Sequence, residues 1–316
     1  MSATAPVSEP GAAIDASAPL RTSRRWGGTG RTGPVLAVVA AILAVWYLAA
    51  VPMNWPTVGA RLTTANGGTP PDPWTHVLAT WAAERPVLPA PHQIAAEIWR
   101  TTVDVRPTSP RSLLFHAQVT LSSTLLGFAM GSVLGILIAV GILHSRTLDR
   151  SLMPWVIASQ TIPILAVAPM IIVVLNSVGV TGLVPKAIIS TYLSFFPVTV
   201  GMVKGLRSPD RMHLDLMRTY GANRLQTLLK LRTPASLPFL FASMKIAVAA
   251  ALVGAIVGEL PTGAQAGLGA RLLAGSYYGQ TIQIWSALVA ASLLAGILVA
   301  LVGVAEKIAV RRMGAR

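Results

Sequence analysis

The sequence predicts an all-α polytopic membrane protein with about six transmembrane helices. Of its 316 residues, 53% are hydrophobic and only 11% are charged, and the mean hydropathy is +0.63. Soluble domains usually carry about 25% charged residues, so this chain has too few charges to cover the surface of a soluble fold. The charged residues are also gathered between long apolar runs instead of being spread evenly. These three observations argue against a soluble enzyme.

Six apolar segments are long enough to cross a membrane, because about 20 helical residues span a bilayer core of about 30 Å. The first segment is too long for the apolar part of a cleaved signal peptide, and five more follow, so we interpret it as an uncleaved helix. Prolines within the third and fourth segments predict kinked helices packed inside a bundle. The predicted spans are residues 34–51, 113–143, 152–178, 183–203, 237–260 and 282–305.

The distribution of basic residues predicts the orientation. With the N-terminus in the cytoplasm, the segments on that side contain seventeen Lys and Arg residues, whereas the two short loops on the other side contain one each, Lys186 and Arg271. The positive-inside rule therefore places both termini in the cytoplasm of a multi-pass protein of the cell membrane. The net charge of +14 then requires no nucleic acid partner. The absence of cysteine excludes disulfides, thiolate metal sites and a cysteine nucleophile.

We divide the chain into three parts. Residues 1–33 are a disordered cytoplasmic tail, residues 34–112 contain the first span and a long extracytoplasmic loop, and residues 113–316 form a core with five spans. Within the long loop, residues 93–102 have the pattern of an interfacial helix, and the tryptophans of this loop suit the headgroup level. His76, His92 and His116 lack the spacing of metal ligands, so we expect no metal site.

The predicted cytoplasmic segment between the fourth and fifth spans, residues 204–236, is too long for a simple turn. Its apolar residues recur every three or four positions, which predicts helix. Gly221 interrupts this pattern, so we expect a helix, a sharp bend at Gly221, and a second short helix that ends before Pro234. By pattern alone, a basic amphipathic hairpin lying on lipid headgroups remains an equal alternative.

A short motif lies within this segment. It reads Asp-Leu-Met at residues 215–217, then three residues, then Gly-Ala, with an apolar residue and a proline further on. The motif resembles the EAA loop of binding-protein-dependent ABC transporter permeases. Leu216 and Met217 depart from the family pattern, because alanines stand at these positions in the family, and Thr233 replaces a leucine. The matching residues are Asp215, Gly221, Ala222, Leu231 and Pro234.

Further motifs are similar to the nitrate/sulfonate/taurine-type branch of these permeases. The resemblance extends from about residue 88 to the C-terminus. The motifs that carry it are Leu-Pro-Ala-Pro at 88–91, Ile-Pro at 162–163 with Pro169, Phe-Phe-Pro at 195–197 and Gly-Leu-Arg-Ser at 205–208.

This resemblance implies a membrane subunit of an ABC importer. In such permeases the EAA helices dock into a groove of a separate ATPase, which would bind ATP and Mg²⁺, and an extracytoplasmic solute-binding protein delivers the solute. The sequence contains no phosphate-binding loop of its own, so we expect no enzymatic activity and no cofactor in this chain. The resemblance also implies a permease homodimer. Arg218 and Arg224 are expected to support the contact with the ATPase.

Two sets of residues within the spans are candidates for further roles. Gly127, Gly131 and Gly135 recur every four residues and predict a close helix contact, either within the subunit or across a dimer axis. Lys245 and Glu259 are ionisable residues in or near the fifth predicted span, so each is a candidate for the translocation path. A buried Lys245 facing a central cavity would suit an anionic solute.

The predicted function is import of a small solute, of a sulfonate, nitrate or taurine type, with a pyrimidine-like vitamin precursor as the alternative solute. An ATP-independent secondary carrier or channel is the alternative class. Such a carrier is expected to show inverted repeats and paired broken spans near the midplane. We find neither feature in the sequence, and the spans contain no acid cluster for proton relay or catalysis.

Overall fold

The computed structural model describes residues 32–261 and 266–312, and the chain is helical without a strand in these ranges. Five of the described helices are long and apolar enough to cross a membrane, and six spans result if one bent helix pair counts as a span. The predicted all-α polytopic fold is therefore confirmed. Almost all of the predicted disordered tail lies outside the described residues.

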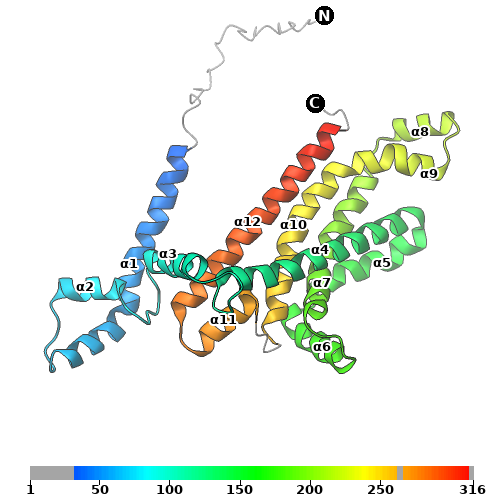
Figure 1. Ribbon diagram of the computed structural model, residues 1–316. Helices are drawn as coiled ribbons and strands as arrows, with labels where there is room; N and C mark the ends of the chain where they lie inside the picture. Colours follow the sequence, from blue (N-terminus) through cyan, green and yellow to red (C-terminus); the bar gives the residue numbers. More distant parts are fainter. Residues whose placement is uncertain (1–31, 262–265, 313–316) are drawn as a thin grey trace, which may run out of the picture. The chain divides into compact units, whose positions relative to one another are not determined.

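The described chain divides into two units between Trp46 and Tyr47, a boundary that falls inside helix α1 (Thr32–Ala65), and Figure 1 shows α1 in blue. Our prediction ended the first helix at residue 51, before Pro52. The helix instead continues with both Pro52 and Pro56 inside it. A proline weakens a helix by removing one N–H donor, but tertiary contacts of the second half of α1 hold that half in helical form.

The first of these contacts is a buried amide. Asn54 is fully buried, and its Oδ1 accepts hydrogen bonds from the backbone N–H groups of Val87 (2.7 Å) and Leu88 (3.2 Å). Its Nδ2 donates to the carbonyl oxygens of Thr80 (3.2 Å) and Leu88 (2.9 Å). The side-chain amide has two donors and two acceptor lone pairs, so all four are used to fasten residues 80–88 to α1.

The second contact involves α2 (Pro73–Trp81), a helix that the sequence analysis did not predict. The His76 ring stacks on Trp55 with 3.7 Å between ring centroids, and His76 Nε2 donates to the Trp55 carbonyl (3.1 Å). Gly59 leaves room for this ring, because a Cβ there would lie 2.8 Å from the imidazole. The stretch after the first predicted span is therefore a packed helical unit instead of a loop.

Three long helices form the centre of the unit Tyr47–Arg316. They are α4 (Leu113–His144), α7 (Leu183–Leu206) and α10 (Thr233–Glu259), and α7 packs closely on both of the others. Small residues line these contacts. On the α4 side, Cβ atoms at Gly127 and Gly131 would lie 2.2 Å from Ser190 Cβ and 2.0 Å from Ser194 Oγ of α7. The glycine face of α4, including Gly135, thus lies against α7 of the same chain.

The predicted third span is not one helix. Helix α5 (Arg146–Ala158) leads into a 3₁₀ turn, η2 (Ser159–Thr161), and α6 (Ile164–Ser177) follows at an angle of 101°. Ile162 is extended because a residue before proline disfavours the helical region, and Pro163 then caps α6. We predicted kinks within one span, so a break this sharp is a correction.

The remaining helices surround this centre. Helix α3 (Pro91–Trp99) continues into a π-helical turn, η1 (Arg100–Asp104), where an interfacial helix was predicted. Helix α12 (Thr281–Arg312) packs against α3, α10 and a short helix, α11 (Leu268–Tyr277), that was not predicted. The Lys186 and Arg271 positions, predicted to lie in loops, are instead buried within α7 and α11.

Substituting a contact glycine tests this packing. We expect Gly127→Ala to destabilise the folded protein by about 1–3 kcal/mol, because the new methyl group overlaps the α7 backbone and Ser190. Thermal unfolding in detergent measures the effect. Gly296→Ala on α12 is the matched control, since no atom lies within 4 Å of a Cβ there. Equal melting temperatures for the two variants would contradict the α4–α7 contact.

Candidate functional site

The segment with the EAA-like motif forms a helical hairpin. Helix α8 (Arg211–Thr219) is followed by a sharp turn and by α9 (Arg224–Thr227), and we call residues 211–227 the α8–α9 hairpin. The predicted helix and the bend at Gly221 are both present. Figure 1 shows the hairpin extending beyond the N-terminal end of α10.

Local sequence explains the turn. The Gly221 N–H donates to the Arg218 carbonyl and the Ala222 N–H donates to the Met217 carbonyl, each at 2.9 Å. This pair of hydrogen bonds is a Schellman motif, which requires a left-handed residue after the helix. Gly221 supplies it with φ of +66°, and no atom lies within 4 Å of a Cβ added there. The requirement for glycine is therefore one of backbone conformation and not of space.

The second helix starts with a capping box and does not end where we predicted. Asn223 accepts a hydrogen bond from the Gln226 N–H (2.8 Å), and the Gln226 side chain accepts one from the Asn223 N–H (3.0 Å). We predicted an end before Pro234. Instead, α9 passes through a π-helical turn, η3 (Leu228–Arg232), into α10, with Pro234 in the first turn of α10. Pro234 removes one N–H donor from the helical run at the point where the wider π-helical turn meets α10.

Helix α8 has two opposed faces. Met212, Leu216 and Tyr220, spaced four residues apart, are 73%, 52% and 80% exposed and form an apolar stripe. Leu214 and Arg218 project from the opposite side of the helix and line a pocket. An exposed apolar stripe on a polar helix indicates a surface that contacts another molecule.

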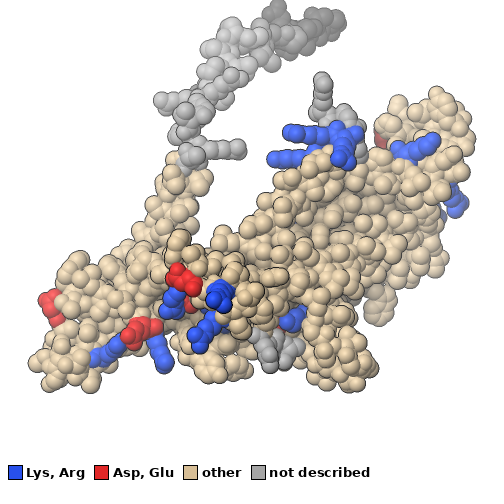
Figure 2. Space-filling model, in the orientation of Figure 1, with Lys and Arg blue, Asp and Glu red and all other residues tan. Residues whose placement is uncertain are grey.

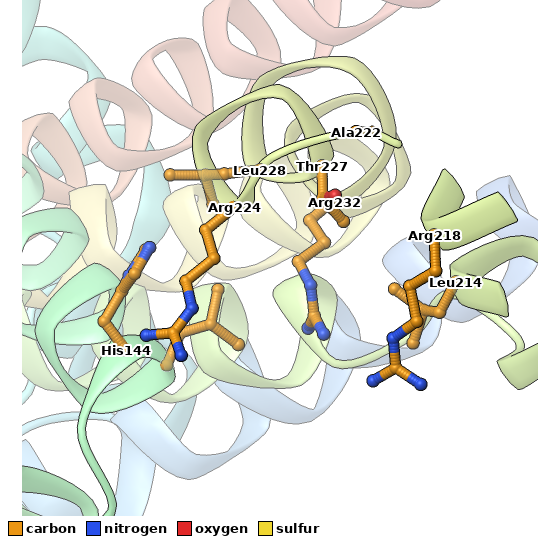
Figure 3. A pocket seen from close by; sticks show the side chains of 9 residues that line it. His144, Leu214, Arg218, Ala222, Arg224, Thr227, Leu228 and Arg232 are labelled. Atoms are coloured by element: carbon orange, nitrogen blue, oxygen red, sulfur yellow. The ribbon is translucent and has the colours of Figure 1, made fainter. Parts of the chain in front are cut away.

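The pocket behind α8 has a volume of about 510 Å³ (Figure 3). Its walls come from the C-terminal end of α4, from α8 and from the segment that joins the hairpin to α10. The basic side chains that line it are His144, Arg218, Arg224 and Arg232. The others are Leu143, Leu214, Ala222, Thr227 and Leu228.

The remaining residues of the predicted motif have varied surroundings. Asp215 forms an exposed ion pair with Arg218 (3.0 Å). Met217 is half-buried in α8, Leu231 is half-buried in η3, and Pro234 is exposed. No local sequence pattern indicates the contribution of α4, because His144 is about 70 residues away from the motif along the chain. Figure 2 shows basic residues gathered around the hairpin and at the C-terminal end of α12.

Glu259 lies at the far end of α10 from the hairpin and is fully buried. Its carboxylate accepts hydrogen bonds from the Thr120 hydroxyl of α4 (2.9 Å) and from the Gly269 N–H of α11 (2.8 Å). The N–H groups of Gly267 and Leu268 donate to His116 Nδ1 (3.0 Å) and Thr120 Oγ1 (2.8 Å). Buried side chains thus cap three successive N–H groups at the start of α11.

The glycine pair at 267 and 269 has a structural explanation. A Cβ at Gly267 would lie 2.2 Å from Glu259 Cδ, and one at Gly269 would lie 2.4 Å from the Ile256 carbonyl oxygen. Only glycine therefore lets this segment approach the carboxylate so closely. The Lys186 ammonium of α7 donates to the Ala266 carbonyl (3.4 Å) and adds a positive charge on the same side.

Arg271 ties α11 to α3. Its Nη2 lies 3.3 Å from Glu97 Oε1, and its Nη1 donates to the Arg111 carbonyl (3.0 Å). Burial lowers the pKa of the Arg271 guanidinium, and the Glu97 carboxylate opposes this shift. A buried charge is tolerated here because it is paired.

Lys245 is not an unpaired intramembrane cation. Its ammonium forms an ion pair with Glu306 of α12, and both side chains are half-buried. No sequence pattern identifies Glu306 as the partner, because it lies 61 residues further along the chain. The charge of Lys245 is therefore neutralised within the chain.

Comparisons with known proteins identify the family. The family described as binding-protein-dependent transport system inner membrane component matches residues 131–315, so the chain belongs to it. The sequence is 35% identical to the formylaminopyrimidine transport permease ThiX of Halalkalibacterium halodurans, over 58% of this chain and 68% of ThiX. It is 32% identical to the riboflavin transport system permease RibX of Chloroflexus aurantiacus, over 71% of this chain and 80% of RibX.

A third relative is the putative aliphatic sulfonates transport permease SsuC of Bacillus subtilis, which is 26% identical over 56% of this chain and 62% of SsuC. The resemblance to the sulfonate-type branch is therefore confirmed. The chain is a permease subunit of an ABC transporter, a transport component of the inner membrane. Members of this family act with a binding protein and an ATPase.

Removing the Glu259 carboxylate tests its role as the cap of α11. We expect Glu259→Ala to cost about 1–3 kcal/mol, because the buried Gly269 N–H loses its acceptor. Glu259→Gln retains an acceptor oxygen and is expected to keep most of the stability. Hydrogen exchange at residues 267–277 measures the effect, and unchanged exchange in Glu259→Ala would show that the cap does not hold this helix.

Proposed function

We propose that this chain forms the membrane pathway of an ABC importer and that its α8–α9 hairpin docks onto a separate ATPase subunit. The observation that carries the proposal is the exposed apolar stripe of Met212, Leu216 and Tyr220 on a helix that a hydrogen-bonded turn joins to the helical run of a membrane span. Asp215 lies beside this stripe and adds a polar contact for the partner, Arg218 on the pocket side of α8 pairs with Asp215, and Arg224 follows the turn.

The connection to the span supports mechanical coupling. Residues 224–259 form one helical run of 36 residues from the hairpin to the Glu259 cap. A continuous helix transmits displacement along its axis, so movement of the hairpin would move the far end of α10. Leu231 and Pro234 lie within this run, and the turn at Gly221 and Ala222 sets the angle at which α8 joins it. ATP and Mg²⁺ would be held by the ATPase.

We further propose that both termini and the hairpin face the cytoplasm and that two copies of this chain pair in the transporter. The excess of basic residues around the hairpin supports the orientation. Because the sequence contains no cysteine, a single cysteine at Tyr220, which is 80% exposed, reports its side of the membrane. Labelling by an impermeant maleimide from outside intact cells would contradict this orientation.

The solute we favour is a small nitrogen heterocycle of the pyrimidine or flavin type. The sequence is 32–35% identical to permeases named for formylaminopyrimidine and riboflavin but 26% identical to the one named for sulfonates. The Lys245–Glu306 pair also neutralises the lysine that would have suited an anionic solute. An anionic solute of the sulfonate, nitrate or taurine type is the second candidate.

Uptake by cells that express this chain with its ATPase and binding protein separates the two solute classes. We expect a labelled pyrimidine or flavin to accumulate and labelled taurine and nitrate to remain at background. Accumulation of taurine or nitrate alone would favour the anionic class. Accumulation of any of them without ATP would instead indicate a secondary carrier or channel.

Changing Gly221 tests the coupling role of the hairpin. A residue other than glycine in the left-handed conformation costs about 1–2 kcal/mol, and asparagine tolerates it better than a β-branched residue. We expect Gly221→Val to insert normally but to hydrolyse ATP without matching uptake in vesicles. Gly221→Asn is the matched control and is expected to retain most uptake. Normal uptake by Gly221→Val would contradict the proposal.

A further inference from the structure

The pocket behind α8 is positively charged. Four of its nine lining residues are Arg or His, and none is Asp or Glu. Figure 3 shows the side chains of Arg218, Arg224 and Arg232 extending in the same direction from α8, α9 and η3, with His144 of α4 near Arg224. An anion entering this space would meet cationic groups from three elements.

These cationic groups are only partly neutralised. Arg218 pairs with Asp215, and Arg232 donates one hydrogen bond to the Leu206 carbonyl (2.7 Å). The Arg224 guanidinium has no hydrogen bond or ion pair with any residue in the described part of the chain. His144 Nδ1 donates to the Val140 carbonyl (2.9 Å), which leaves Nε2 of a neutral imidazole as an acceptor, so the three arginines are the donors that an anion would meet.

The position of the pocket favours a ligand that comes from the membrane. It lies on the side of α8 opposite the apolar stripe, so a partner docked on that stripe would leave the pocket between the hairpin and the membrane spans. Leu143 and His144 in its wall are the last two residues of α4. With the hairpin in the cytoplasm, the end of this span is at the level of the inner-leaflet headgroups.

The shape and chemistry of the walls fit a lipid headgroup. The volume of about 510 Å³ falls in the range of small-molecule sites and exceeds what one protein carboxylate requires. Guanidinium groups bind phosphate oxygens in a two-pronged geometry. Leu143, Leu214 and Leu228 provide an apolar wall beside the cations. A zwitterionic headgroup also carries a cation, and no carboxylate lines the pocket to pair with it. The lining therefore favours an anionic headgroup.

We propose that this pocket binds the phosphate of an anionic phospholipid from the cytoplasmic leaflet. The lipid phosphate contacts Arg224 and the free donors of Arg218 and Arg232, and the rest of the headgroup lies against Leu143 and His144, so that the lipid holds the hairpin against the end of α4. The assignment rests on the proposed cytoplasmic orientation of the hairpin. It does not require that the ATPase bind where we propose.

Lipid retention by the purified full-length chain tests the proposal without the ATPase. The protein is equilibrated with equal amounts of phosphatidylglycerol and phosphatidylcholine, and bound lipid is counted by native mass spectrometry. We expect the wild type to prefer phosphatidylglycerol and Arg224→Gln to bind it about fivefold more weakly, the effect of one arginine at an anionic surface. Arg224→Lys, which keeps the charge, is expected to recover part of the binding.

Lys230→Gln is the matched control, because it removes the same charge from the adjoining η3 turn but does not line the pocket. It is expected to bind phosphatidylglycerol as the wild type does. Equal losses in Arg224→Gln and Lys230→Gln would overturn the site, since they would indicate general surface attraction. The double variant Arg218→Gln/Arg224→Gln should weaken binding further, and no additional loss would also count against the pocket.

Two further experiments test whether something other than a lipid fills the pocket. If inorganic phosphate displaces phosphatidylglycerol from the wild type, the pocket is a site for soluble phosphate and the lipid assignment is wrong. In nanodiscs of phosphatidylcholine alone, Arg232→Gln, which changes a pocket residue outside the proposed ATPase contact, should bind the ATPase as the wild type does. Weaker binding by this variant there would show that an acidic segment of the ATPase fills the pocket instead.

Discussion

Close packing of small residues between α4, α7 and α10 is the constraint on which the rest of the structure depends. Glycines on α4 and on α10 face serines of α7, and the backbones approach so closely that a methyl group has no room. Lipid tails are as apolar as leucine, so contact between helices in a membrane depends on such fit. This rigid centre positions both functional ends of α10, namely the α8–α9 hairpin and the Glu259 cap.

Buried polar groups add specific connections around this centre. Asn54 uses its complete amide, Glu259 accepts hydrogen bonds from α4 and α11, and Arg271 joins α11 to α3. A polar group buried without a partner is costly in free energy, and each of these groups has partners that come from other helices. Each of them therefore selects one arrangement of helices, which apolar contacts alone would specify less strictly.

Helix α8 of the hairpin has an apolar surface on one side and faces a basic pocket on the other. The stripe of Met212, Leu216 and Tyr220 is apolar and exposed, whereas Leu214 and Arg218 face a basic pocket next to the spans. The two alternatives left open by the sequence, docking to an ATPase or association with headgroups, therefore need not exclude each other. Opposite faces of α8 are suited to one and to the other.

The sequence by itself determined the apolar spans, the excess of basic residues around the hairpin and the turn at Gly221, because periodicity, charge and helix caps act over a few residues. It also carried the EAA-like motif, whose spacing is local. Only the tertiary structure decided that α1 continues past Pro52, that Lys245 pairs with Glu306, and that Glu259 caps α11. These features join residues far apart in the chain, and no local pattern specifies which helices meet. The pocket also depends on the tertiary structure, since His144 and Arg224 line it together only when α4 packs beside the hairpin.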